Sequence, residues 1–395
     1  MIKNKLTNKN TIIIATGGTG GHVAPALSII SKLIDHNLII ITDIRGEMFF
    51  KKFYKNEDKS SNINKASHQL IVHDITSPNN KGLIKKLKSS FQILLSTIKC
   101  LNLFINNKPQ IIIGFGGYSS VTPLIAAKLL RIPIIIHEQN AVLGRANRFL
   151  SKFANILALS FKDTKFNKKN YKSVFIGNPV REEFNIIGKL KYSPPEQGKQ
   201  FSILIMGGSL GASFFSNNIP AILCSLPIEI KKRLNVFHQV KEEEIINVKQ
   251  LYDKNKINSE VKSFFEDIFI QFKKAHLIIA RSGGSSIAEI LAANRPTIFI
   301  PLPTALDNHQ VENANYIVKK NGGWLLDQNK TSPKLFKKVL KDLILNPKKL
   351  REASIQIKKI SSYHLSLCDN KSPTSFFINI ITKLLLLNIK EDLKS

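Results

Sequence analysis

Four glycine-rich turns supply residue types that can hold a phosphate group. Each one follows a short apolar run, as a strand-to-helix turn does. Glycine lets the backbone approach a phosphate without a Cβ in the way, and a helix N-terminus favours an anion. A single such turn also fits ordinary strand–helix packing, but four in two matched halves predict phosphate bound from both sides of one cleft. The turns are Gly17-Gly18-Thr19-Gly20-Gly21-His22, Gly114-Phe115-Gly116-Gly117-Tyr118-Ser119, Gly207-Gly208-Ser209-Leu210-Gly211-Ala212 and Arg281-Ser282-Gly283-Gly284-Ser285-Ser286.

The common nucleotide signatures are not met at these turns. A dinucleotide fingerprint would need glycine at position 23, which is Val23. A P-loop needs Ser or Thr after Gly-Lys, but Leu190 follows Gly188-Lys189 and Gln200 follows Gly198-Lys199. The chain also has no Asp-x-Asp pair to hold a divalent cation on a diphosphate. We therefore predict no metal site and no cofactor.

The first half of the chain, residues 10–178, alternates Ile- and Val-rich runs with longer amphipathic stretches. Continuous apolar strands separated by helices indicate a parallel sheet that is covered on both faces. We predict strands at Thr11–Ala15, Leu38–Thr42, Gln69–Val72, Gln110–Ile113, Pro133–His137, Ile156–Leu159 and Ser173–Ile176, and helices at Ala24–Asp35, Leu83–Ile105, Thr122–Leu130 and Arg145–Phe153.

The pattern breaks after residue 178 and then restarts. Residues 179–200 are polar near Pro194-Pro195 and are read as a linker. Beyond them we predict strands at Phe201–Met206, Leu234–Gln239, Glu260–Phe264, Leu277–Ala280 and Thr297–Ile300, and helices at Gly211–Leu223, Ser285–Ala293, His309–Lys320 and Pro333–Leu345. The expected class is α/β, with two tandem Rossmann-like domains and a cleft between them. The domains span residues 1–178 and 201–362, and a helical tail covers 363–395.

Composition narrows the classes of partner. The chain has 395 residues, 43% of them hydrophobic, so most of it is expected to fold. Three cysteines without a Cys-x-x-Cys pair exclude a disulfide scaffold and a cysteine zinc site. The net charge of +30 points to anionic partners, although a composition rich in Lys, Asn and Ile throughout accounts for part of it. No basic stripe with interleaved aromatics is present, so nucleic acid is not an expected partner.

Five motifs, taken in order, resemble the MurG family of bacterial UDP-N-acetylglucosamine:lipid I N-acetylglucosaminyltransferases. The resemblance runs from about residue 11 to about residue 365. It implies the GT-B glycosyltransferase fold and the transfer of N-acetylglucosamine, without a metal and with inversion, to the C4 hydroxyl of muramoyl pentapeptide in lipid I, which gives lipid II. The motifs are the first glycine turn, His137-Glu138-Gln139-Asn140, Gly177-Asn178-Pro179-Val180-Arg181, Gly207-Gly208-Ser209 with Gly211-Ala212, and Arg281-Ser282-Gly283 with Glu289.

The resemblance also implies roles for individual residues. His22 is the leading candidate for the general base and Glu138 the second; the alternatives are a turn-packing histidine and a structural carboxylate. The implied UDP-N-acetylglucosamine contacts are Thr19, Gly20, Gly21, Asn140, Arg181, Ser209, Phe265, Gly284, Ser285, Ser286, Glu289 and Gln310. The implied acceptor-diphosphate contacts are Gly18, Gly116, Gly117 and Tyr118. Leu210 departs from the family, which usually has glutamine there, and so removes one possible donor contact.

The sequence leaves an alternative function open. A different GT-B enzyme or a UDP-sugar epimerase would share the donor site, and the acceptor-side motifs argue against it.

The resemblance implies a peripheral protein on the cytoplasmic face of the bacterial inner membrane, with other cell-wall synthesis proteins as possible partners. The helix expected from Leu83 carries Lys85, Lys86 and Lys88 before an apolar face. This face is predicted to lie on anionic headgroups, with packing into the core as the alternative. The apolar residues are Phe91, Ile93, Leu94, Leu95, Ile98, Leu101 and Phe104.

Overall fold

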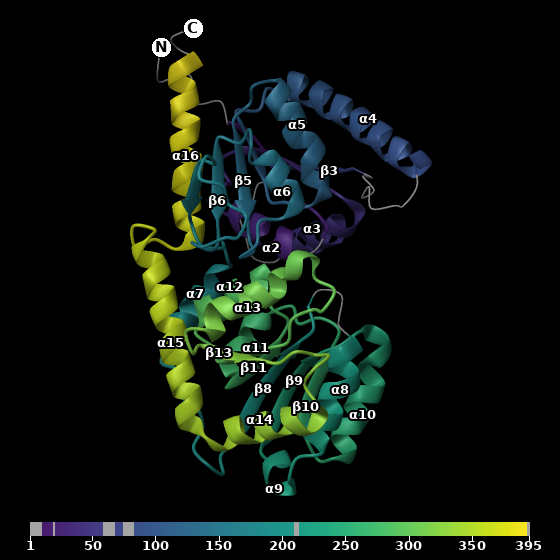
Figure 1. Cartoon of the computed structure of the whole chain (residues 1–395), viewed down its shortest axis with the longest axis vertical. Coiled ribbons are helices and arrows are strands. Elements are labelled where there is room, and N and C mark those ends of the chain that lie inside the picture. Colours follow the sequence, from purple (N-terminus) through teal and green to yellow (C-terminus); the bar gives the residue numbers. More distant parts are fainter. Residues whose placement is uncertain (1–9, 19, 58–67, 74–82, 209–212, 393–395) are drawn as a thin grey trace. The chain divides into compact units, whose positions relative to one another are not determined.

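The computed structural model describes residues 10–18, 20–57, 68–73, 83–208 and 213–392. The chain divides into two compact units. The first holds the residues up to Pro179 together with those from Leu367 onward, and the second is Val180–Ser366. Each unit is described by itself (Figure 1).

The first unit is built on a parallel sheet of seven strands in the order β3-β2-β1-β4-β5-β6-β7. Strand β1 lies inside the sheet and is apolar after Thr11, and its Ile13 lies opposite Ile39 on one neighbour and Ile112 on the other. A parallel sheet of this kind brings the carboxyl ends of its strands to one edge. The strands are β1 (Thr11–Ala15), β2 (Asn37–Thr42), β3 (His68–Val72), β4 (Ile111–Gly114), β5 (Ile134–Glu138), β6 (Ile156–Leu159) and β7 (Ser173–Phe175).

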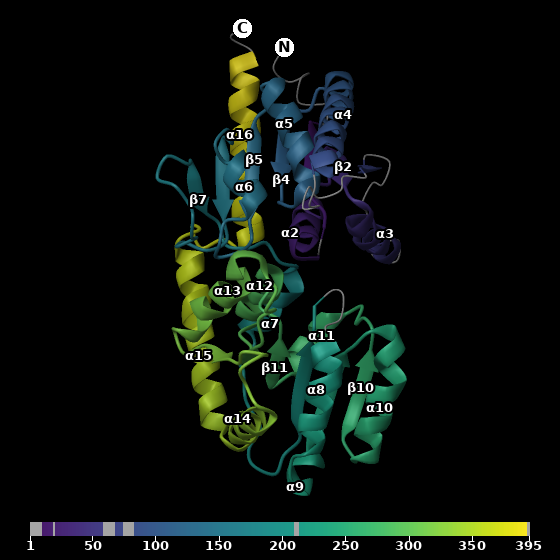
Figure 2. The same ribbon diagram turned by 45° about the vertical axis from the view of Figure 1, so that its right-hand side comes forward.

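Both faces of this sheet are covered, because alternate residues of each strand point to opposite sides. Ile12 and Ile14 pack into one core cluster, and Ile13 and Ala15 pack into another. Figures 1 and 2 show the helices on the two faces. The helices are α2 (Gly20–Ile30), α3 (Ile44–Glu57), α4 (Leu83–Asn107), α5 (Val121–Leu129) and α6 (Arg145–Leu150), with a 3₁₀ turn at Tyr118–Ser120.

The end of the chain returns to the first unit. Helix α16 (Pro373–Asp392) buries Phe377, Ile381 and Leu385 in the same cluster as Ile12 and Ile14. The helical tail predicted at residues 363–395 is therefore divided between the two units in the structure. Helix α15 (Pro347–Ser366) ends in the second unit, and α16 completes the core of the first.

The second unit repeats the plan with a parallel sheet of six strands in the order β10-β9-β8-β11-β12-β13. Its helices include α7, which occupies part of the segment expected to be a linker and packs on α12 through Gly188. The strands are β8 (Phe201–Met206), β9 (Leu234–Gln239), β10 (Asn258–Lys262), β11 (Leu277–Ala280), β12 (Thr297–Phe299) and β13 (Gly323–Leu325). The remaining helices are α7 (Glu182–Lys189), α8 (Ser213–Cys224), α9 (Ile228–Lys231), α10 (Ile245–Lys254), α11 (Ile268–Lys274), α12 (Gly284–Ala293), α13 (His309–Val318) and α14 (Pro333–Leu345).

The predicted α/β class with two Rossmann-like sheets is confirmed. Each strand expected from the sequence is present to within two residues at either end. The structure adds α3, α7, α9, α10, α11 and α15 among the helices, and β13 among the strands.

Candidate functional site

The first glycine turn is held by a carboxylate from the next strand. Gly18 has φ +84°, and its amide donates to Asp43 Oδ1 at 2.9 Å. The same oxygen accepts the Gly46 amide at 2.8 Å, and the Arg45 guanidinium donates to Oδ2 at 3.0 Å. Burial opposes ionisation of Asp43, but these hydrogen bonds outweigh it and lower the pKa of the carboxyl. Asp43 therefore stays ionised and fixes the turn.

Asp43 and Arg45 are absent from the residues that the sequence singles out. Arg45 adds a cation beside the turn, since a Cβ on Gly18 would lie 3.4 Å from its Nη2. Its side chain is 69% exposed, so it can also reach a ligand. The only signal in the sequence is an aspartate directly after a buried strand, which on its own is too common to identify a site. Thr19 lies outside the described residues, and Gly20 and Gly21 begin α2.

His22 lies between the first and second glycine turns. A Cβ on Gly116, whose φ is +88°, would stand 3.1 Å from His22 Cδ2. A Cβ on Gly117, at φ +82°, would stand 3.1 Å from the Gly17 carbonyl oxygen. Glycine is required at both positions for this close approach. The turns that follow β1 and β4 thus meet around one half-buried imidazole, and Tyr118 begins the 3₁₀ turn in the second of them.

Glu138 is a buried carboxylate whose two oxygens are both occupied. Oε1 accepts the Asn140 amide at 3.0 Å and its side-chain Nδ2 at 3.1 Å. Oε2 accepts the Gly144 amide at 2.8 Å and Asn147 Nδ2 at 2.9 Å. Burial raises the pKa of Glu138, and these hydrogen bonds act in the opposite sense. The geometry favours the structural alternative over the role of base, because no oxygen is presented to a substrate.

His137, next to Glu138, is part of the core. Its ring lies 5.4 Å from Phe115 and 5.8 Å from Phe377 of α16, measured between ring centroids. Ser160 Oγ is 3.1 Å from its Nε2. Burial lowers the pKa of His137 to about 3, so the ring is neutral at physiological pH.

In the second unit, Glu289 stands on α12 behind the fourth glycine turn. Gly283 caps the helix, and Gly284, Ser285 and Ser286 form its first turn. Glu289 is partly exposed, and burial raises the pKa of its carboxyl to about 7 against the opposing charge of Arg181. Within the described part of the chain the structure records no hydrogen bond to Glu289. Glu289 is the sixth residue of α12, beyond its first turn, and its carboxylate has acceptor capacity to spare.

Gln310 and Arg281 are both hydrogen-bonded to backbone groups of the second unit. Gln310 Oε1 accepts the Leu302 amide at 3.0 Å, and the Gln310 carbonyl accepts Ser282 Oγ at 2.8 Å. Because Oε1 is already used, the amide nitrogen is the group of the Gln310 side chain that could donate a hydrogen bond to a donor sugar. Arg281 donates to the Ile300 and Pro301 carbonyls, both at 2.9 Å, and burial lowers its pKa to about 10. Arg281 is therefore a structural cation.

The other residues expected to contact the donor differ in how exposed they are. Phe265 is 4% exposed, so its ring is part of the core of the second unit. Arg181 is exposed and begins α7, with its guanidinium 5.2 Å from the Phe184 ring centroid. Ser209 and Leu210 lie outside the described residues, although Gly208 before them has φ +96°.

Within the described segments, no three His, Cys, Asp or Glu side chains gather as ligands for a metal ion. None of the described helices has the length and apolar character needed to cross a bilayer. Helix α4 has two apolar sides: Cys100 and Phe104 are buried in the core, whereas Phe91, Leu94, Leu95 and Ile98 are 43–60% exposed. The side chains of Lys85, Lys86 and Lys88 lie outside those described.

Two family models match the chain. One describes the glycosyltransferase family 28 N-terminal domain and matches residues 12–158; the other describes the C-terminal domain of that family and matches residues 202–366. Curated relatives match at greater length. A UDP-N-acetylglucosamine–N-acetylmuramyl-(pentapeptide) pyrophosphoryl-undecaprenol N-acetylglucosamine transferase of Wolbachia pipientis subsp. Culex pipiens is 40% identical over 351 residues, 88% of this chain and 94% of the relative. A protein of the same name from Zymomonas mobilis is 36% identical, over 88% of each chain.

Solved structures agree with these matches. Acinetobacter baumannii MurG superposes with a TM-score of 0.69 at 26% identity, covering 95% of this chain and 99% of that one. A UDP-N-acetylglucosamine 2-epimerase superposes with a TM-score of 0.56 at 14% identity, covering 88% and 91%. The second likeness shows the fold alone.

Proposed function

The chain belongs to the MurG family of family 28 glycosyltransferases, and on that premise we propose that it transfers N-acetylglucosamine from UDP-N-acetylglucosamine to the C4 hydroxyl of muramoyl pentapeptide in lipid I. The product is lipid II, and the enzyme works at the cytoplasmic face of the bacterial inner membrane. The names of relatives that are 36–40% identical support this substrate pair.

The geometric observation that carries the proposal is the position of His22. Its imidazole stands between two glycine turns whose backbone amides suit the acceptor diphosphate. In the proposed reaction His22 takes the proton of the C4 hydroxyl as that oxygen bonds the anomeric carbon and the bond to UDP breaks. Attack from the face opposite the leaving group inverts the configuration at that carbon. Gly18, Gly116, Gly117 and Tyr118 hold the acceptor, and Asp43 with Arg45 supports them.

We assign Glu138 a positioning role. Its carboxylate fixes both the backbone and the side chain of Asn140, and so sets where Asn140 meets the transferred sugar. A residue acting in this way supports the chemistry without touching a proton of the substrate.

Donor binding is assigned to the second unit. Glu289 accepts hydrogen bonds from ribose hydroxyls, and Gln310 donates to the sugar. The N-terminal turn of α12, with Ser285 and Ser286, stabilises the UDP diphosphate together with Arg181. These groups supply the positive potential that a metal ion provides in other transferases, so transfer is expected to continue in EDTA.

Membrane contact is assigned to α4. Phe91, Leu94, Leu95 and Ile98 recur at the i, i+3, i+4, i+7 spacing of one helix face, and all are exposed. Leu94→Asp with Ile98→Asp should release the protein from vesicles that contain anionic lipid, while Leu386→Asp on α16 serves as an exposed control (52%). Equal retention of both variants on the vesicles would place the contact elsewhere.

The function is tested by incubating the protein with labelled UDP-N-acetylglucosamine and lipid I. Label entering the lipid extract in a β-linked disaccharide supports inverting transfer. Conversion of UDP-N-acetylglucosamine to its 2-epimer without acceptor would instead assign epimerase activity. His22→Ala should lower kcat by about 10²–10⁴-fold with little change in donor affinity. If kcat stays near that of the wild-type enzyme, His22 packs the turn and does not act as the base.

A further inference from the structure

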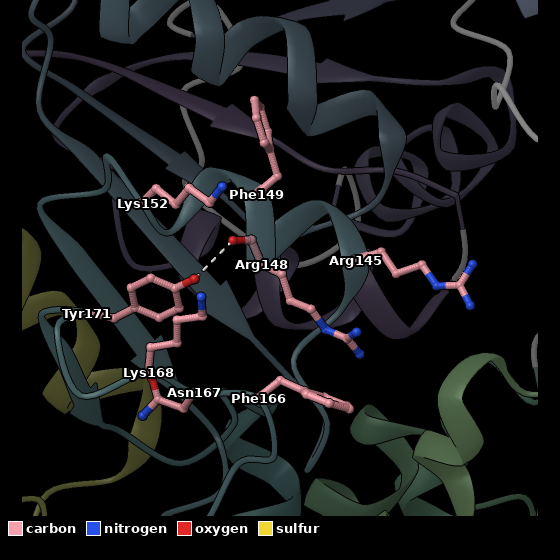
Figure 3. Close-up of a pocket in the computed structure, with 8 residues that line it drawn as sticks. All are labelled: Arg145, Arg148, Phe149, Lys152, Phe166, Asn167, Lys168 and Tyr171. Carbon is pink, nitrogen blue, oxygen red and sulfur yellow. Dashed lines mark hydrogen bonds between the residues drawn. The ribbon is translucent and has the colours of Figure 1, made fainter.

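A second concave site lies on the first unit, beside α6 and outside the residues assigned so far. Its volume is about 430 Å³, within the usual range for ligand pockets. Figure 3 shows its lining side chains, which come from α6, from the turn that follows α6 and from the loop that precedes β7. The lining residues are Arg145, Arg148, Phe149, Lys152, Phe166, Asn167, Lys168 and Tyr171.

The charge of the lining is one-sided. Four of the eight side chains are cations, Arg145, Arg148, Lys152 and Lys168, and none of the eight is acidic. A concave surface that concentrates one sign of charge favours a ligand of the opposite sign. The pocket is thus suited to an anion.

Arg148 is held in a fixed orientation. Its Nε donates to the Leu143 carbonyl at 2.7 Å, and its guanidinium carbon lies 3.8 Å from the centroid of the Phe166 ring. Tyr171 Oη donates to the Arg148 carbonyl at 3.2 Å, the dashed line in Figure 3. A planar guanidinium that is pre-oriented in this way suits the two oxygens of a carboxylate.

Two aromatic rings add apolar surface to the charged wall. Phe149 is 51% exposed and Phe166 is 58% exposed. Phe166 also has φ +63°, a conformation that bulky residues rarely adopt. Cations mixed with open aromatic rings fit a ligand that carries small apolar groups next to its charge, as a short peptide does.

Helix α6 links this pocket to the acceptor side. Asn147 on α6 bonds Glu138, and its Nδ2 would stand 3.5 Å from a Cβ on Gly116. Arg145, Arg148 and Phe149 leave the same helix toward the pocket. A helix with its side chains is about 10–12 Å across. Five extended residues reach roughly 17 Å, enough to pass from one side of α6 to the other.

We propose that this pocket binds the carboxylate end of the acceptor's peptide, and this inference rests on the proposed function. A peptide joined to the muramoyl group through its amino end keeps a free carboxylate at its other end. The sugar would lie at His22, the peptide would cross α6, and its terminal carboxylate would meet Arg148, Lys152 and Lys168.

The test compares two acceptors in detergent solution: lipid I, and lipid I whose peptide ends in a C-terminal amide. In the wild-type enzyme the amide should raise the acceptor KM by about 5–10-fold, the scale of a charge-assisted contact at a partly exposed site. Lys152→Gln with Lys168→Gln should raise the KM for lipid I by a similar factor and leave the KM for the amide unchanged. The kcat and the donor KM should be unaffected.

The matched control is Lys169→Gln with Lys172→Gln, which removes two exposed lysines outside the pocket and should behave as wild type. Equal KM values for the two acceptors in the wild-type enzyme would overturn the inference while leaving the transferase intact. A pocket variant that loses only its binding to anionic vesicles would assign the site to a lipid headgroup, again overturning it. Failure of the wild type to glycosylate either acceptor would count against the proposed function itself.

Discussion

Glu138 in the first unit and Glu289 in the second are the two carboxylates that the family motifs single out, and their surroundings differ. Both have pKa values raised by burial. Glu138 is 1% exposed and accepts four hydrogen bonds from its own loop and from α6. Glu289 is partly exposed and accepts none from the described residues. The same side chain is therefore enclosed by donors in one unit, whereas in the other it keeps the acceptor capacity that the proposed ribose contact needs.

Among the variants that test this difference, Glu138→Ala is expected to have the largest effect, and the effect is on stability. It leaves the amides of Asn140 and Gly144, and Nδ2 of Asn147, without their acceptor. The free energy of unfolding should fall by about 3–5 kcal/mol, measured by denaturant titration of the full chain. A variant as stable as wild type but without turnover would return Glu138 to the role of base.

Glu289→Ala is expected to act on the binding of the donor. Loss of a charged acceptor for ribose is expected to raise the KM for UDP-N-acetylglucosamine by about 10–100-fold, with a much smaller change for lipid I. Steady-state kinetics with each substrate varied in turn measures this. Equal rises in both KM values would contradict the ribose contact.

Glu289→Gln tests how the carboxyl of Glu289 makes the stability of the protein depend on pH. The folded-state pKa of about 7 lies above the ordinary value of 4.5, so the folded protein keeps a proton that the unfolded chain has lost. Stability therefore falls as pH rises from about 4.5 through about 7. A shift of this size corresponds to roughly 3 kcal/mol, and solvent screening of the partly exposed side chain reduces it, so the Gln variant should be more stable than wild type by up to about 2 kcal/mol at pH 8 and similar to it at pH 4. A gain of the same size at both pH values would rule out titration as its cause.

Asn140→Ala has the smallest expected effect. It removes one side-chain hydrogen bond to Glu138 while leaving the backbone bond, so the loss of stability should be about 1 kcal/mol. A loss approaching that of Glu138→Ala would show that the side chain of Asn140, rather than the carboxylate, organises the loop.

The buried strands could be predicted from sequence almost to the residue. Runs such as Ile12-Ile13-Ile14 are apolar without interruption, which only a strand covered on both faces explains at that length. Helix α7 was missed because it follows Asn178-Pro179 and begins with two glutamates, features shared with linkers. Strand β13 was missed because three residues carry no periodicity.

The motifs of the site could be predicted from the sequence, but the different roles of the residues within them could not. His22 and Glu138 were each singled out from a motif that follows a predicted strand, but their surroundings could not be predicted. The donors that enclose Glu138 come from the loop at residues 139–144 and from Asn147 on α6, and no local pattern reveals the course of this loop. Asp43 was missed for the same reason, since its partners Gly18 and Gly46 come from two different turns.

The return of α16 to the first unit sets an order on synthesis. Phe377, Ile381 and Leu385 fill the core around Ile12 and Ile14, yet they leave the ribosome after the whole of Val180–Ser366. Domains generally fold as units while the chain emerges. The second unit can therefore close while the first still lacks one wall, so the unit that is begun first is finished last.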